Sequence, residues 1–225
     1  MRDEHILREQ ASDTSREQGE RLPGALAVLL ERESVSLQEI DCFSVATGPG
    51  SYTGLRVGIA TMQGLAMAVG KPLIGVSAFE ALAMLAGVME DGAGRVGPGP
   101  PDGPISVQGR VRVATWIDAW RGDVFAAMYE GNRGLDTPVV ARPEDVLARL
   151  KGQTTVFIGD GAARNQEVIR AALGDAARLL DPVAPLLAGA LAILAGEAFC
   201  AGQRPPPHAI RPIYVRRLEP ALARV

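Results

Sequence analysis

The apolar residues in the first part of the chain recur at the spacing of an α-helix and then give way to short apolar runs. Residues 16–32 carry leucines on one helical face, and Pro23 lies near the start of this predicted helix, where its missing N–H costs little. Ser36 and Glu39 have the spacing of a capping box over a short helical turn. The run at 42–46 predicts a strand that ends at a Gly-Pro-Gly turn.

Helices and strands continue to alternate along the rest of the chain. The pattern predicts strands at 72–76, 111–117, 124–129, 138–141, 155–158 and near Leu179, and helices at 51–69, 77–88, 162–173, 185–200 and one opened by Pro143. Residues 91–110 are rich in Gly and Pro, which is typical of a boundary. We therefore expect an N-terminal lobe at 1–90, a linker or insertion at 91–110, and a C-terminal lobe with a closing segment at 111–225.

Two segments of the chain have the same plan. CFSVATGPGSYTGLRVG and TTVFIGDGAARNQEVIR both read as strand, Gly-x-Gly turn and helix, and each follows an amphipathic helix and precedes another strand and helix. The second half has strands before its first helix, whereas the first half offers only a weak one there. The first copy of this repeat is expected to be shortened at its N-terminus.

Composition narrows the classes of function. The 225 residues include 26 acidic and 23 basic side chains, so the whole molecule has no electrostatic footprint for gripping nucleic-acid phosphates. Cys42 and Cys200 have no C-x-x-C spacing, and MRDEHILREQ lacks the apolar region of a signal peptide, so we expect a cytoplasmic location. The charge-free run at 57–70 is too short to cross a bilayer, and no membrane role is expected.

The Gly-Pro-Gly turn at 48–50 leaves two interpretations open. Glycine amides and a helix N-terminus can together bind an anion, which makes Gly48, Gly50 and Ser51 candidate contacts for a nucleotide or phosphate. The turn lacks the ending of a Walker A loop, and no acidic residue follows the next strand as a dinucleotide site requires. The alternative is that these glycines only allow a tight turn and close packing, which is also the expectation for the turn at 159–161.

The sequence offers no clear pairing of a nucleophile with an activating base for covalent catalysis. The histidines are His5, in the N-terminal segment, and His208, beside a proline run, and neither is placed to activate a nucleophile. Asp118, Asp123 and Asp160 could gather as acidic pairs do in acid–base sites, but solvated turn carboxylates are their ordinary explanation. We assign no catalytic residue and no metal ligand.

The helix predicted at 51–69 has Arg56 as its one charged residue. A helix that is apolar nearly all round should be covered on more than one side. Either it lies centrally in its own fold, or one side packs on the sheet and the other on a second protein chain. The second interpretation makes this helix a candidate partner interface.

Residues 41–82 resemble the central signature of the TsaB (YeaZ) family, whose G-P-G-S-[FY]-T-G-[LV]-R core is kept at 48–56. WIDAWRGDVFAAMYE, the GDGA turn and the closing PIYVRR are further similarities, so the resemblance spans most of the chain after about residue 16. It implies the two-lobed α/β fold of actin, sugar kinases and Hsp70, which is ribonuclease H-like. The usual opening strand of that fold is absent, so the N-terminal lobe is expected to lack its first strand and to expose a sheet edge.

The resemblance also implies a function. It predicts a non-catalytic scaffold subunit of the complex that attaches threonylcarbamoyl to the tRNA adenosine next to the anticodon. Its partners would be the TsaD paralogue, which carries the metal and performs the transfer, and the TsaE ATPase, with tRNA held only through the complex. ATP or ADP and a metal ion are expected in those partners, and no cofactor on this chain alone. Pairing through the first two helices of the N-terminal lobe implies the interface candidates Arg21, Leu22, Leu26, Arg56, Ile59, Met62 and Gln63.

Two alternatives stay open. The first is a nucleotide-dependent enzyme of the same superfamily, either a kinase or a glycoprotease-like peptidase, although the phosphate hairpin of the first lobe is mostly missing. The second is a stand-alone homodimer that uses the same apolar helix.

Overall fold

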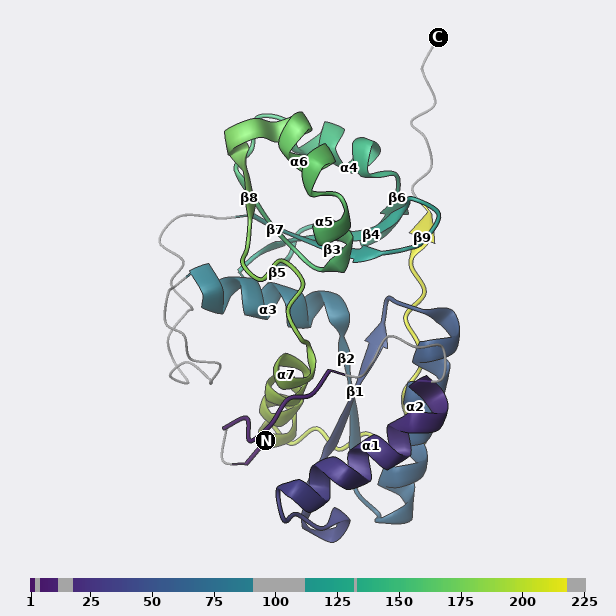
Figure 1. Ribbon diagram of the computed structural model, residues 1–225. Helices are drawn as coiled ribbons and strands as arrows, with labels where there is room; N and C mark the ends of the chain where they lie inside the picture. The colour runs from purple at the N-terminus through teal and green to yellow at the C-terminus, as the bar shows by residue number, and fades with distance from the viewer. Residues whose placement is uncertain (3–4, 12–17, 91–111, 132, 218–225) are drawn as a thin grey trace. The chain divides into compact units, whose positions relative to one another are not determined.

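Figure 1 shows the computed structural model, which describes residues 1–2, 5–11, 18–90, 112–131 and 133–217. The chain forms two compact units. The first combines Met1–Ser106 with Leu186–Ile213, and the second combines Val107–Pro185 with Tyr214–Val225.

The first unit is built on a β-α-β motif. Strands β1 (Phe43–Gly48) and β2 (Leu73–Ser77) are parallel, and α2 (Tyr52–Ala68) connects them. The other elements of this unit are α1 (Gln18–Arg32), η1 (Leu37–Glu39), α3 (Ala78–Glu90), α7 (Ala188–Cys200) and η3 (Pro207–Ala209). The capping box is confirmed, because the Ser36 N–H donates to the Glu39 carboxylate at 2.7 Å. This hydrogen bond holds the pKa of Glu39 below its ordinary value.

Both faces of the two-stranded sheet carry apolar side chains. Phe43 and Leu73 pack with Ala66 of α2 on one face. Ile74 and Val76 pack with Ala195 of α7 on the other face, as the alternation of side chains along a strand requires. Helices α2 and α7 therefore cover opposite faces of β1 and β2.

The second unit contains a mixed sheet in the order β8-β7-β3-β4-β6-β9, with β5 paired to β4. Strands β3, β4 and β6 form an antiparallel meander, whereas β7 runs parallel to both β3 and β8, and β9 runs parallel to β6. The strands are β3 (Arg112–Asp118), β4 (Val124–Glu130), β5 (Arg133–Gly134), β6 (Val139–Ala141), β7 (Thr155–Ile158), β8 (Ala177–Leu179) and β9 (Arg216–Arg217). The helices are α4 (Pro143–Leu150), α5 (Asp160–Arg164), α6 (Gln166–Leu173) and the short η2 (Gly174–Ala176).

An aromatic pair lies at the centre of the second unit. The ring centroids of Trp116 and Phe157 are 5.3 Å apart, and the rings meet edge to face. Both side chains are fully buried, and α4 adds Val146, Leu147 and Leu150 to the same apolar cluster. This cluster joins β3, β4 and β7 to the helix that covers them.

Most predicted elements are confirmed within one or two residues, and three details differ. The helix predicted at 162–173 is two helices, α5 and α6, which meet at Asn165; the Asn165 side chain donates to the Gly161 carbonyl at 2.8 Å and so competes with helical hydrogen bonding. Helix α7 begins at Ala188 rather than at 185. Pro23 lies inside α1 rather than in its first turn.

The packing of α7 corrects the predicted lobe boundaries. Residues 111–225 were expected to form the C-terminal lobe, but α7 contacts β1, β2 and α3 of the first unit. The second face of a parallel sheet must be covered by apolar side chains, and this helix from late in the chain covers it. The predicted linker at 91–110 lies outside the described residues.

The internal repeat is confirmed by the order of elements. The motif β1-α2-β2 has the plan of β7-α5-α6-β8, with a parallel pair of strands in each case. Three strands, β3, β4 and β6, precede α4 in the second unit, whereas residues 1–2 and 5–11 contribute only an isolated bridge between Arg2 and His5. In its described residues, the first unit therefore lacks more than the opening strand.

No helix in the described ranges is both long and apolar enough to span a bilayer.

The two tryptophans provide a test of this core. Trp116→Ala removes a fully buried side chain and should lower the free energy of unfolding by about 3–5 kcal/mol. Trp120→Ala is the matched control, because Trp120 is 50% exposed and its loss should cost less than about 1 kcal/mol. Urea unfolding followed by far-ultraviolet circular dichroism measures both, and equal losses would contradict this description of the core.

Candidate functional site

Helix α2 begins and ends where its flanking residues dictate. The Ser51 hydroxyl accepts the Gly54 N–H at 3.2 Å, which caps the first turn. At the other end, Val69 is followed by Gly70 with a φ of +67°, a conformation that glycine adopts without strain. Between them, Ile59 and Ala66 are the buried residues of the helix.

Three of the four interface candidates on α2 are used within the first unit. Ile59 is 4% exposed, and Met62 packs into the apolar cluster between α2 and the sheet. The Gln63 side chain donates to the carbonyl of Pro207 at 2.9 Å and to that of Ile210 at 3.2 Å. Ile59 is therefore corrected from an interface residue to a core residue. Arg56 is exposed, with its guanidinium 4.0 Å from the centre of the Tyr52 ring.

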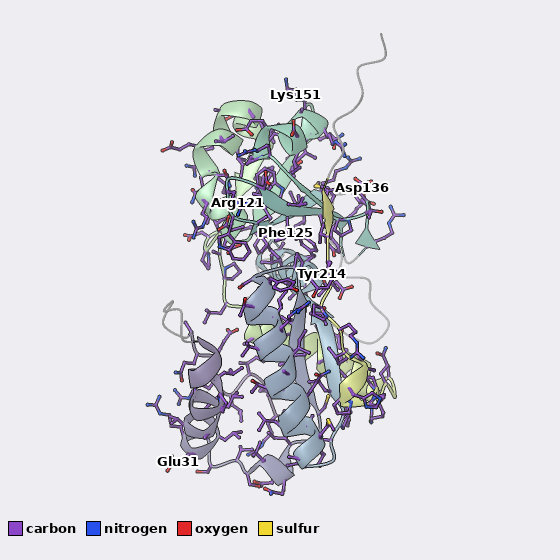
Figure 2. All side chains as sticks on the ribbon, turned by 90° about the vertical axis from the view of Figure 1, so that its right-hand side faces the viewer. Glu31, Arg121, Phe125, Asp136, Lys151 and Tyr214 are labelled. Atoms are coloured by element: carbon purple, nitrogen blue, oxygen red, sulfur yellow. The ribbon has the colours of Figure 1, made fainter. Side chains whose placement is uncertain are left out.

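The candidates on α1 lie beside α2 but are less enclosed. Leu22 and Leu26 are half-buried, and α1 contacts α2 (Figure 2). The side chain of Arg21 lies outside the described residues. The two helices thus form one layer on the same side of the first unit.

The outward face of α2 consists mostly of residues that the sequence analysis did not select. Tyr52 is 59% exposed and Met67 is 61% exposed, at opposite ends of the helix. Between them the exposed positions include small residues, Ala60 and Gly64, four residues apart on one face. This surface, Tyr52, Ala60, Gly64 and Met67, is called the α2 outer face below. In the sequence, small residues at helical spacing could have indicated this face. Only the packing shows which side of α2 faces the sheet.

The glycine turn before α2 is explained by packing. Gly48 has a φ of +107°, and a Cβ atom there would lie 2.8 Å from the Leu55 side chain. Leu55 also lies against Gly50, so one side chain in the first turn of α2 covers both glycines. The Leu55 N–H donates to the Ser51 carbonyl at 2.8 Å. The anion site at Gly48, Gly50 and Ser51 stays a prediction. The positive φ and the close approach of Leu55 account for Gly48, whereas a Cβ atom at Gly50 would make only ordinary contacts, at 3.9 Å or more.

The aspartates of the second unit gather near the ends of β3 and β7. The Asp118 N–H donates to Asp160 Oδ1 at 3.0 Å, and Asp118 Oδ2 lies 3.4 Å from Arg164 Nε. Asp123, which is buried, has its Oδ1 3.4 Å from Arg142 Nε. These carboxylates orient turns and pair with arginines. Across the described ranges, no three His, Cys, Asp or Glu side chains are grouped so as to hold a metal ion.

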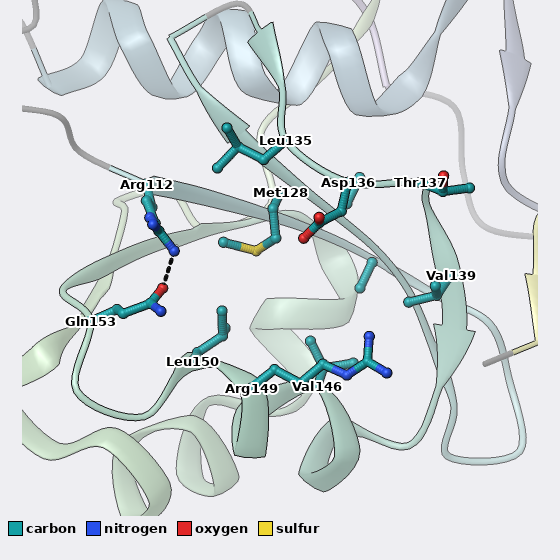
Figure 3. Close-up of a pocket in the computed structure, with 12 residues that line it drawn as sticks. Arg112, Met128, Leu135, Asp136, Thr137, Val139, Val146, Arg149, Leu150 and Gln153 are labelled. Atoms are coloured by element: carbon teal, nitrogen blue, oxygen red, sulfur yellow. Dashed lines mark hydrogen bonds between the residues drawn. The ribbon is translucent and has the colours of Figure 1, made fainter. Parts of the chain in front are cut away.

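Two further features are the half-buried Cys42 thiol and a cavity in the second unit. Burial raises the pKa of the Cys42 thiol, which is the opposite of what an activated nucleophile requires. A cavity of about 100 Å³ lies between the sheet and α4 in the second unit (Figure 3). Met128 and Leu150 form part of its apolar wall, and Arg112 reaches Gln153 by a hydrogen bond at its rim.

Known proteins are similar to this chain in sequence and in fold. A family model described as TsaD, tRNA N6-adenosine threonylcarbamoyltransferase, matches residues 6–97. The chain is 31% identical over 141 residues to the tRNA threonylcarbamoyladenosine biosynthesis protein TsaB of Escherichia coli, covering 60% of this chain and 53% of that protein. It is 28% identical over 180 residues to the Bacillus subtilis protein of the same name, covering 77% and 70%.

A solved structure, YeaZ from Pseudomonas aeruginosa, matches with a TM-score of 0.65 and 26% identity, over 90% of this chain and 88% of that chain. The chain is similar to TsaB and YeaZ proteins in sequence and in fold. Its alignment spans about half the length of the Escherichia coli relative. The two-unit α/β fold predicted from the TsaB resemblance is confirmed by this structural match.

Gly161 tests the close approach of the aspartate turn to β3. A Cβ atom at Gly161 would lie 2.8 Å from the Ile117 carbonyl carbon and 3.0 Å from the Asp118 nitrogen, so Gly161→Ala should cost about 1–3 kcal/mol. At Gly58 of α2 nothing lies within 4 Å, so Gly58→Ala should stabilise by about 0.5–1 kcal/mol. Denaturant midpoints would show opposite signs, and a stable Gly161→Ala protein would contradict the packing.

Proposed function

We propose that this chain is a non-catalytic scaffold subunit of the machinery that makes threonylcarbamoyladenosine in tRNA, and that it binds and activates a TsaD-type transferase. Two relatives carry the name tRNA threonylcarbamoyladenosine biosynthesis protein TsaB, which supports the pathway. The match of residues 6–97 to the transferase family model supports a partner that is a paralogue of this chain. The same proposal includes the TsaE ATPase as a second partner and a cytoplasmic location. In it, ATP or ADP and the tRNA are bound by the assembled complex and not by this chain alone.

The observation that carries the proposal is the α2 outer face. Ala60 and Gly64 are exposed on a helix whose one charged side chain is Arg56, so the helix can approach another helix closely without burying an unpaired carboxylate or ammonium. Tyr52 and Met67 add large exposed apolar surface at its ends. Tyrosine, methionine and arginine are enriched at interfaces between proteins.

The region that matches the transferase family also contains this face. Residues 6–97 include α1, β1, α2 and β2, so a paralogue would present helices equivalent to α1 and α2. Two related chains can then pair through the same elements about an approximate two-fold axis. Such pairing would bury the α2 outer face against its counterpart.

An arginine on this face tests the proposal. Ala60→Arg should fold normally, because Ala60 is exposed, but should weaken the complex with the TsaD paralogue from the same genome by at least about tenfold. Ala171→Arg is the matched control, since Ala171 is also exposed on a helix, α6, and should leave binding unchanged. Isothermal titration calorimetry of the purified proteins gives the affinities.

Modification assays extend the same experiment to activation. Threonylcarbamoylation of tRNA by TsaD with its other components should depend on the wild-type chain and fall with Ala60→Arg. Normal modification without this chain would refute the scaffold role. Ile59→Arg is unsuitable as a probe, because Ile59 is buried in its own unit and the variant should unfold that unit.

A further inference from the structure

The cavity of about 100 Å³ in the second unit has an apolar floor. Met128 of β4, Val139 of β6, and Val146 and Leu150 of α4 line it, and all four belong to the apolar cluster around Trp116 or pack against it. Val146 and Leu150 are each 5% exposed, so the floor of the cavity is part of the core. An apolar lining of this kind favours an apolar group over water.

The volume of the cavity limits the size of this apolar group. An apolar cavity of about 150 Å³ holds one benzene molecule, so about 100 Å³ provides room for a group of about three or four carbon atoms. Branched chains such as isopropyl and isobutyl have this size. An aromatic ring or a nucleobase is too large for the same space.

Charged side chains of both signs line the opening of the cavity (Figure 3). Asp136 belongs to the segment between β5 and β6, and Arg149 belongs to the last turn of α4, so they reach the opening from different elements. Both are exposed, and neither forms an ion pair with a described side chain, including Asp145 one turn earlier on α4. Arg112, elsewhere on the rim, is held by its hydrogen bond to Gln153. The opening thus offers one carboxylate and one guanidinium to a ligand.

We propose that this cavity binds a free aliphatic amino acid of the size of valine or leucine. The branched side chain of the ligand occupies the apolar floor, its carboxylate pairs with Arg149, and its ammonium pairs with Asp136. A guanidinium group binds a carboxylate through two parallel N–H donors, which suits Arg149 to this role. The site belongs to the second unit and the α2 outer face to the first, so this proposal does not depend on the scaffold role.

The charges at the opening distinguish this ligand from simpler ones. A carboxylate without an ammonium would face Asp136 with a like charge, and an amine without a carboxylate would face Arg149 in the same way. A small inorganic anion would leave the apolar floor uncovered. A zwitterion with an apolar side chain uses the floor and both charges together.

Methyl NMR of the purified full-length chain tests the site with L-leucine as the probe. The Met128 methyl signal should shift and saturate with a dissociation constant of about 1–10 mM, because the cavity is small and its charged groups are exposed. Met67 is the internal control, since it is 61% exposed on α2 and its signal should not move. Absence of a Met128 shift at about 50 mM L-leucine, well above the expected dissociation constant, would overturn the proposal.

Three analogues of L-leucine test the individual contacts. L-Alanine has three fewer side-chain carbons and should bind at least about tenfold more weakly. 4-Methylpentanoate lacks the ammonium and 3-methylbutylamine lacks the carboxylate, and each should bind about threefold more weakly, which is the loss of one exposed ion pair. Equal affinity for L-alanine would refute the apolar contact, and equal affinity for either of the other two would refute an amino acid as the ligand.

Two neutral substitutions assign the charged contacts to their residues. Asp136→Asn should abolish the preference for L-leucine over 4-methylpentanoate and keep its preference over 3-methylbutylamine, and Arg149→Gln should do the reverse. Both side chains are exposed, so both variants should keep the circular dichroism spectrum of the wild type. Preferences that survive both substitutions would place the ligand elsewhere and overturn the proposal.

A larger side chain in β6 tests the cavity itself. Val139→Phe should fill the space and abolish the Met128 shift. Val140→Phe is the matched control, because Val140 is also half-buried but points to the other face of the strand and is not among the lining residues. Unchanged binding by a folded Val139→Phe protein would contradict the site, and the two charge variants decide the question if this variant does not fold.

Discussion

A parallel β-sheet needs apolar cover on both faces, and this requirement organises the first unit. Strands β1 and β2 direct Phe43 and Leu73 to one face and Ile74 and Val76 to the other. Helix α2, which connects the two strands, can cover only one of these faces. Helix α7, more than a hundred residues later in the sequence, covers the other, so the chain must return to its first unit before it ends in the second.

Because α2 covers one face of this sheet, one side of the helix is buried and the other is exposed. Ile59 and Ala66 face the sheet, and Gln63 holds the segment around Pro207 and Ile210 through two hydrogen bonds. The opposite side needs no long polar side chains for solubility beyond Arg56, and its small residues allow another helix to come close. These contacts within the first unit fix which side of α2 faces outward.

The second unit serves as an internal reference for the first. Its sheet contains the three-strand meander, the parallel strands and the covering helix α4, and its core closes around Trp116 and Phe157. In the described residues of the first unit, the parallel strands are present without a meander, so α1 and the outer edge of β1 have less to pack against. The comparison between the two units therefore shows which elements they share and, in the described residues, where they differ.

Local pattern was sufficient for the elements themselves. The period of the leucines, the S-x-x-E capping box, the Gly-Pro-Gly turn and the repeated strand-turn-helix order predicted most of the strands and helices, because each depends on neighbouring residues. The residues of the GPGSYTGLR segment also carried the resemblance to the TsaB (YeaZ) family.

Tertiary structure decided which faces are buried and which unit each element joins. A helix that is apolar nearly all round gives no sequence signal for its orientation, so Ile59 was assigned to a partner surface although it lies in the core, and Ala60, one residue later, faces outward. The placement of α7 likewise depends on the uncovered face of a distant sheet. Such long-range packing is absent from local periodicity, and only the folded chain reveals it.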